Sequence, residues 1–152
     1  MAKIFDVPNG FKKHHNAFIM NKIEHIGIAV KDLATANETY TKLLGKAPYK
    51  SERVESEWVE TSFFETGASK IELLQATSSE SAIAKYIEKR GEGIHHIAFA
   101  TDDIEKEVAR LIAEGFQPIS AAPKRGADNK LVFFFHPKST NGVLIELCQD
   151  IN

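Results

Sequence analysis

Apolar residues recur along this chain with two different periods, and the change of period predicts the elements. Residues 23–30 alternate between bulky apolar positions and positions that hold His25, Gly27 and Ala29. This alternation predicts a strand. Apolar residues then recur at helical spacing between Asp32, an expected N-cap, and Gly45, an expected helix end. The apolar face of this helix is expected to comprise Leu33, Ala36, Tyr40, Leu43 and Leu44.

The second half of the chain repeats this layout. Asp103 is the expected N-cap of a helix that ends before Gly115, and its apolar face is expected to comprise Ile104, Val108, Leu111 and Ile112. A helix over residues 79–90 links the two halves. Further strands are expected at roughly 48–55, 58–66 and 69–76 in the first half, and at roughly 117–121, 131–136 and 142–149 in the second.

Two pairs of segments show that the halves are related in sequence. IEHIGIAVKDL at 23–33 matches IHHIAFATDDI at 94–104, and IELLQ at 71–75 matches IELCQ at 145–149. Two matches in the same order and at nearly the same offset indicate an internal duplication. We therefore expect an α+β fold of two tandem βαβββ modules, at about 21–77 and 93–150. Their sheets pair into one curved layer that forms a cleft, with the helices outside.

Composition narrows the class of protein. The chain has 152 residues, of which 43% are hydrophobic, so it can bury a core. Its 19 basic and 21 acidic residues give a net charge of -2, which disfavours a nucleic-acid partner, and no apolar run approaches the ~18 residues that would cross a membrane. The single cysteine, Cys148, suits a reducing cytoplasm. Residues 1–20 are expected to form a flexible tail before the domain at 21–150.

Four polar side chains are expected to meet in the cleft. His25 and His96 share their strand faces with small residues, and Glu72 and Glu146 point away from their apolar neighbours. A buried carboxylate is rare unless it is paired or bound to a metal. Two imidazoles and two carboxylates suit a divalent ion such as Co²⁺, Mn²⁺, Zn²⁺ or Ni²⁺. A single such histidine would more often be a core residue, and His95 is expected to point to the other face.

The same stretches resemble the vicinal oxygen chelate superfamily, also called glyoxalase-like, and within it the methylmalonyl-CoA epimerase family. The similarity runs from Asn21 to Gln149 and is most specific at 136–147, HPKSTNGVLIEL. It implies one divalent metal ion, with Co²⁺ as first choice, on the ligand positions His25, Glu72, His96 and Glu146. It also implies that Glu60 and Glu146 act as the catalytic acid–base pair. Asp128 and Asn129 depart from the loop found in many relatives.

The resemblance implies an epimerase that removes the C2 proton of methylmalonyl-CoA and returns a proton to the other face of the resulting enolate. It further implies an acyl-CoA substrate. The charge balance, the apolar runs and the single cysteine lead us to expect no nucleic-acid partner, no membrane and a cytoplasmic location, and exposed sheet edges favour a homodimer. A glyoxalase I type lactoylglutathione lyase and a ligand-sequestering protein of the same superfamily are the alternatives. Glu72 as a fourth ligand argues against a ring-cleaving dioxygenase, which uses three protein ligands.

Overall fold

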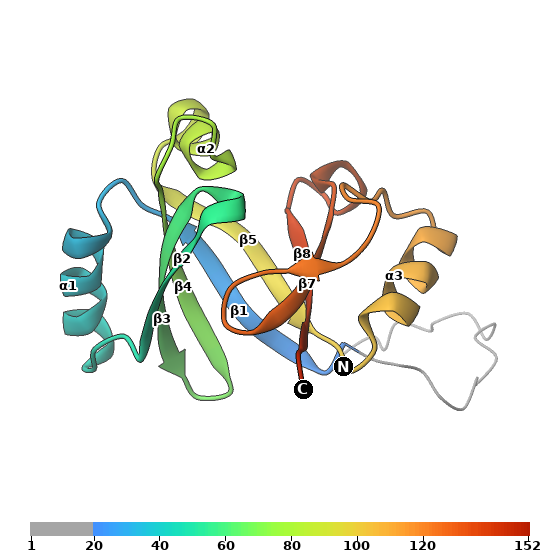
Figure 1. Ribbon diagram of the computed structural model, residues 1–152, viewed down its shortest axis with the longest axis horizontal. Helices are drawn as coiled ribbons and strands as arrows, with labels where there is room; N and C mark the ends of the chain where they lie inside the picture. Colours follow the sequence, from blue (N-terminus) through green and yellow to red (C-terminus); the bar gives the residue numbers. More distant parts are fainter. Residues whose placement is uncertain (1–19) are drawn as a thin grey trace, which may run out of the picture.

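The computed structural model describes residues 20–152, so the tail expected at the N-terminus lies almost wholly outside the described residues (Figure 1). The described chain folds into two modules of the same layout. The first comprises β1 (Lys22–Ala29), α1 (Leu33–Leu44), β2 (Lys50–Val54), β3 (Val59–Thr66) and β4 (Ser69–Ala76). The second comprises β5 (Gly93–Ala100), α3 (Ile104–Ala113), β6 (Lys124–Arg125), β7 (Lys130–Phe135) and β8 (Ile145–Asp150), and α2 (Ala82–Arg90) links them.

The eight strands of residues 20–152 belong to one sheet, in the order β2-β3-β4-β1-β5-β8-β7-β6. β1 and β5 pair antiparallel at its centre, and each is flanked by a parallel partner, β4 or β8, from its own module. Equivalent strands of the two modules therefore occur in the same order from either edge of the sheet, as an approximate two-fold axis requires. This confirms the expected pair of βαβββ modules.

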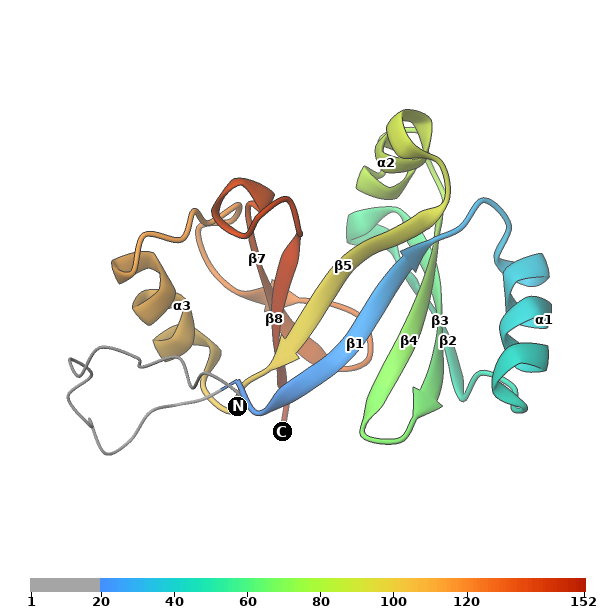
Figure 2. The same cartoon turned by 180° about the vertical axis from the view of Figure 1, so that it is seen from behind.

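Each module has its own apolar core behind the sheet. Leu33 on α1 packs with Phe64 and Leu73, and Ile104 on α3 packs with Phe133 and Leu147. Figures 1 and 2 show α1 and α3 on the outer sides of the curved sheet. The apolar cores therefore lie between the sheet and these two helices.

The helix starts follow the expected caps. The carboxylates of Asp32 and Asp103 accept hydrogen bonds from the backbone N–H groups of Thr35 and Lys106, as N-cap side chains do in the first turn of a helix. Gly45 ends α1 with a φ of 74°, a left-handed conformation that suits glycine.

The apolar faces of the two helices are narrower than expected. Leu43 is 71% exposed and Ile112 is 45% exposed. Each adjoins a residue that does face the core, Leu44 or Leu111, and successive residues of an α-helix lie about 100° apart. The expectation that Leu43 and Ile112 point inward was therefore wrong.

Three element boundaries also differ from the sequence-based expectation. The segment 117–121 contributes only an isolated bridge between Pro118 and Phe135, because proline has no N–H to continue a ladder. The short strand β6 follows it instead. β8 begins three residues later than expected, after a turn at Gly142, whose φ is 86°. The linking helix α2 begins three residues later than expected, after the cap residue Ser81. No helix among residues 20–152 is long and apolar enough to span a membrane.

Candidate metal centre

The two central strands bring His25 and His96 together on the inner face of the sheet. Their Nε2 atoms lie 3.1 Å apart and their rings meet edge to face. Both side chains are buried. The pairing of β1 with β5 thus joins the two copies of the duplicated histidine.

Glu72 on β4 and Glu146 on β8 approach the histidines from the two sides of this central pair. Oε2 of Glu72 lies 3.1 Å from Nε2 of His25 and 3.4 Å from Nε2 of His96. Oε2 of Glu146 lies 3.3 Å and 2.9 Å from the same two atoms. All four side chains that the sequence singled out as ligands therefore lie around the two histidine Nε2 atoms.

The charges of this cluster reinforce one another. Burial alone would lower the pKa of His96, but hydrogen bonds and charge from Glu146 and Glu72 outweigh it and raise that pKa to about 9. The pKa of His25 is also raised against the effect of burial, chiefly by Glu146. In return, the two imidazoles hold the pKa values of Glu72 and Glu146 below the usual range, although burial acts in the opposite direction. The cluster therefore favours bound positive charge between its carboxylates.

Three of these groups fit a divalent ion by chemistry and spacing. His25, His96 and Glu146 form a group that could hold a metal, because one donor atom of each lies within 4.8 Å of the others. Ligand bonds of about 2.0–2.2 Å at right angles would put neighbouring donors about 3 Å apart. The distances of 2.9–3.4 Å between the imidazole and carboxylate donors match this spacing.

Two β-bulges, which the sequence analysis missed, add a second layer to the site. The pairing of β1 with β5 shifts register once at Glu24 and once at His95, so each is an unpaired extra residue. The ring nitrogen Nδ1 of His25 is 2.5 Å from Oε2 of Glu24, and Nδ1 of His96 is 3.0 Å from Nδ1 of His95. Glu24 and His95 occupy equivalent positions, 71 residues apart, which is the one sequence signal that could have found them.

The expectation that His95 points away from the cleft was wrong. It lines the cavity, its ring meets that of Tyr86 edge to face, and burial together with the charge of His96 lowers its pKa to about 4. The bulge is the physical reason, because an extra residue breaks the strict alternation of faces along a strand.

A cavity of about 270 Å³ opens beside the four side chains. Apolar side chains such as Val59, Phe63 and Phe134 form much of its wall, and the ring of Phe134 contacts that of His96. Ile83 on α2 and residues of the β6–β7 hairpin also line it. The apolar wall makes this a site where charges on a bound molecule would be poorly hydrated.

Glu60, the expected catalytic base, lies on the other face of β3. It pairs in register with Gln75, whose side chain reaches the start of α1, and it does not line the cavity. The alternation along β3 was right, but the face that contains Phe64 packs toward α1 instead of the cavity. The cavity face carries Thr61, which donates a hydrogen bond to Oε1 of Glu72 at 3.1 Å.

Comparison with known proteins places this geometry in a family. Residues 24–134 match the model of the Glyoxalase/Bleomycin resistance protein/Dioxygenase superfamily. The Bacillus subtilis protein YqjC is 38% identical over 130 residues, which cover 86% of this chain and 93% of that protein. The ethylmalonyl-CoA/methylmalonyl-CoA epimerase of Cereibacter sphaeroides is 37% identical over 133 residues, which cover 86% of this chain and 99% of that enzyme.

The solved structures agree with the sequence comparison. A variant of Streptomyces coelicolor methylmalonyl-CoA epimerase, in complex with 2-nitronate-propionyl-CoA, is 36% identical and superposes with a TM-score of 0.82. The match covers 85% of this chain and 94% of that one.

Proposed function

Because this chain belongs to the glyoxalase/bleomycin resistance protein/dioxygenase superfamily, we propose that it is a metal-dependent epimerase of a 2-substituted malonyl-CoA thioester, with methylmalonyl-CoA as its substrate. The observation that carries the proposal is the buried group of His25, His96 and Glu146 beside the cavity. Relatives named as epimerases of this substrate class match almost the whole described chain, which supports the same chemistry here.

The proposed ligands of one divalent ion are His25, Glu72, His96 and Glu146, with Co²⁺ as the first choice. When bound, the ion supplies Lewis-acid stabilisation of the negative charge that develops on the thioester oxygen as C2 loses its proton. Glu24 accepts the Nδ1 proton of His25, which leaves Nε2 of that ring free to act as a ligand.

Inversion at C2 needs two groups that exchange protons on opposite faces of the planar enolate. We propose Glu146 and Glu72, because they come from equivalent positions in the two modules and flank the histidines from opposite sides. The hydrogen bond from Thr61 fixes the orientation of the Glu72 carboxylate. The sequence-based pair, Glu146 with Glu60, is the alternative, and the position of Glu60 away from the cavity does not favour it.

Solvent-deuterium incorporation at C2 tests the function directly. Each epimer of methylmalonyl-CoA is incubated in D₂O with the protein, with and without added Co²⁺, and C2 deuterium is measured by NMR. We expect metal-dependent exchange and interconversion of the epimers. No exchange with metal bound would overturn the epimerase proposal. Activity on a glutathione hemithioacetal instead would favour the lyase alternative.

Two matched substitutions distinguish the acid–base pairs. Glu72→Gln keeps an oxygen ligand but removes a proton carrier, so epimerisation should fall by about 10²–10⁴-fold while C2 exchange persists from one epimer only. Glu60→Gln makes the same chemical change outside the cavity and should leave turnover near the wild-type value. The opposite result would restore Glu60 as the base.

We also propose that the active form is a homodimer, for which light scattering on the purified protein is the test. The exposed edges of the sheet, at β2 and β6, support this assembly.

A further inference from the structure

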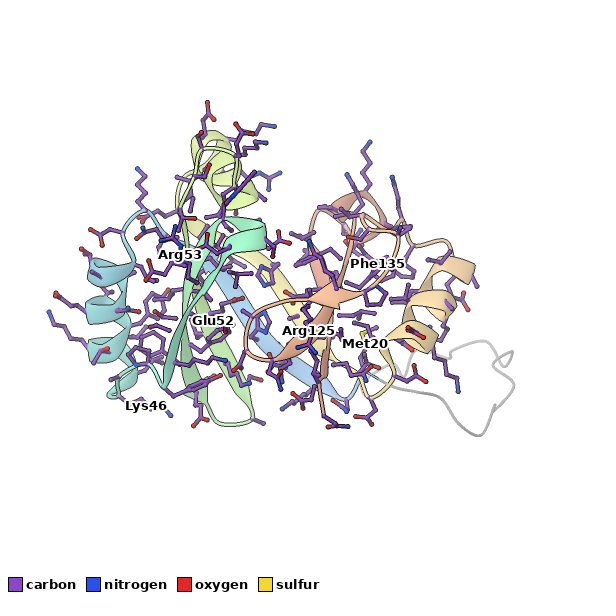
Figure 3. All side chains as sticks on the ribbon, in the orientation of Figure 1. Met20, Lys46, Glu52, Arg53, Arg125 and Phe135 are labelled. Atoms are coloured by element: carbon purple, nitrogen blue, oxygen red, sulfur yellow. The ribbon has the colours of Figure 1, made fainter. Side chains whose placement is uncertain are left out.

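The β6–β7 hairpin of the second module is tied to the first module at its tip, residue Asp128. Its carboxylate accepts hydrogen bonds from the hydroxyl of Tyr49 at 2.8 Å and from Nζ of Lys70 at 3.0 Å. Its backbone N–H donates to Oε2 of Glu52 at 2.9 Å. Figure 3 labels Glu52 on β2 and Arg125 on the hairpin that faces it, and both ribbon views show the hairpin reaching toward the first module.

Lys70 extends this tie to the candidate metal centre. Its ammonium group lies between two carboxylates, 3.0 Å from Asp128 and 2.7 Å from Oε1 of Glu24. The other oxygen of Glu24 holds Nδ1 of His25 at 2.5 Å. One chain of charge-assisted contacts therefore runs from the hairpin tip to a proposed ligand, and such contacts are stronger than those between neutral groups.

The hairpin tip adopts a left-handed backbone conformation at two successive residues. Asp128 and Asn129 have φ values of 56° and 55°, in the left-handed region where aspartate and asparagine are among the few non-glycine residues tolerated. Side-chain contacts to the opposite module stabilise this shape.

We propose that Asp128 is a positioning residue for the metal centre. It holds the hairpin over the cavity and, through Lys70, fixes Glu24 in the orientation that presents His25 to the ion. This inference rests on the proposed metal site but not on the identity of the substrate.

Calorimetry with Co²⁺ on the full metal-free chain tests the proposal without a substrate. Asp128→Asn keeps an oxygen for Tyr49 but removes the charge that holds Lys70. We expect Co²⁺ affinity to fall by about 10-fold, the lower end of the range for residues that support a ligand. Asp102→Asn makes the same change at an exposed aspartate outside this chain of contacts and should leave the affinity unchanged.

A double-mutant cycle then separates positioning from general stabilisation. Lys70→Met breaks the link between Asp128 and Glu24 and should weaken Co²⁺ binding by itself. If the effect of Asp128 passes through Lys70, the double variant should bind no more weakly than Lys70→Met alone. Independent losses that add would overturn the proposed route, as would unchanged affinity in Asp128→Asn.

Folding is monitored by thermal unfolding of each variant. If Asp128→Asn does not fold, Lys70→Met and the conservative variant Lys70→Arg carry the test. Loss of Co²⁺ affinity in Lys70→Met with recovery in Lys70→Arg supports the inference, and equal affinity in both overturns it. A wild-type chain that does not bind Co²⁺ would instead contradict the proposed metal site itself.

Discussion

The imidazole of His96 occupies the space that a side chain at position 27 would fill, and residue 27 is a glycine. A Cβ at Gly27 would lie 2.1 Å from Cε1 of that ring, far inside van der Waals contact. The equivalent position in the second module is Ala98, which is fully buried. His96, a proposed ligand, can therefore take this position only because Gly27 lacks a methyl side chain.

We expect Gly27→Ala to displace His96 and to abolish measurable Co²⁺ binding in calorimetry. The matched control, Ala98→Gly, removes the equivalent methyl group instead of adding one and should retain Co²⁺ binding. Tight binding by Gly27→Ala would mean that His96 is not a ligand.

Asp128 should also make the stability of the protein sensitive to acid. Burial would raise its pKa, but the contacts with Lys70 and Tyr49 outweigh that effect and lower the pKa below the usual 3.8. A lowered carboxyl pKa stabilises the fold above the unfolded-state pKa, and this stabilisation disappears as the pH falls through the folded-state pKa.

We therefore expect the free energy of unfolding of wild type to exceed that of Asp128→Asn above the ordinary carboxyl pKa of about 3.9, and the gap to close as the pH falls through the lowered folded-state pKa. Urea unfolding of both proteins across this range measures it. A gap that stays constant with pH would mean that the charge of Asp128 does not contribute to stability.

Strand alternation was enough to predict which strand face carries the four proposed ligands, but not which residues support them. His25, Glu72, His96 and Glu146 each lie on the face that period two assigns to them. Glu24 and His95 lie at bulges, where one extra residue changes the face, and nothing in the local sequence marks a bulge.

At the scale of elements, the repeated pentapeptides IELLQ and IELCQ each connect the site to a helix. Glutamate, the second residue of each, faces the cavity, and the final glutamine faces the other way. Gln75 accepts a hydrogen bond from the backbone N–H of Leu33 at 2.6 Å, and Gln149 accepts one from Ile104 at 2.7 Å. Each β-strand therefore provides a cap for the helix of its own module.

We expect Gln75→Leu and Gln149→Leu to lower the free energy of unfolding by similar amounts, about 0.5–2 kcal/mol each, because each leaves a helix donor unpaired. Gln117→Leu is the control, since this exposed glutamine bonds to its neighbours through its backbone. Urea unfolding measures all three. A loss no larger than that of the control would show that water replaces the caps.

Glu60 shows what a sequence pattern leaves open at this scale. Alternation correctly groups Glu60 with Phe64, but it does not tell which of the two faces of β3 meets the cavity. That choice depends on where α1 packs, which only the assembled sheet determines.

For the whole molecule, the internal duplication is the feature from which the topology could be predicted. Two copies of one module with matching central strands lead to a sheet that reads the same from both edges, and the structure has this order. The junction of the two modules was less predictable. The hairpin tie at Asp128 joins residues 58–79 positions apart, and no local sequence pattern reports such contacts.

Because the proposed ligands come from both modules, metal binding should stabilise the complete fold. At a Co²⁺ concentration about 1,000 times the Kd, the expected gain is about 4 kcal/mol, or roughly 10 °C in Tm for a domain of this size. Calorimetric unfolding with Co²⁺ and with excess chelator measures the shift.

His25→Gln should abolish this metal-dependent shift, whereas His136→Gln, at a histidine outside the centre, should retain it. A shift that survives in His25→Gln would place the ion elsewhere on the protein.

The two-fold sheet has a consequence for circular permutation. Lys22 and Cys148 both lie in register with Ala100, on neighbouring strands to either side of β5, so the start of β1 and the end of β8 are about 10 Å apart. A linker of a few residues can span that distance. A chain cut before α2 and rejoined from Asn152 to Met20 would put the second module first and still bring all four donor side chains together. Polypeptide continuity between the modules would then matter less to the site than the antiparallel pairing of β1 with β5.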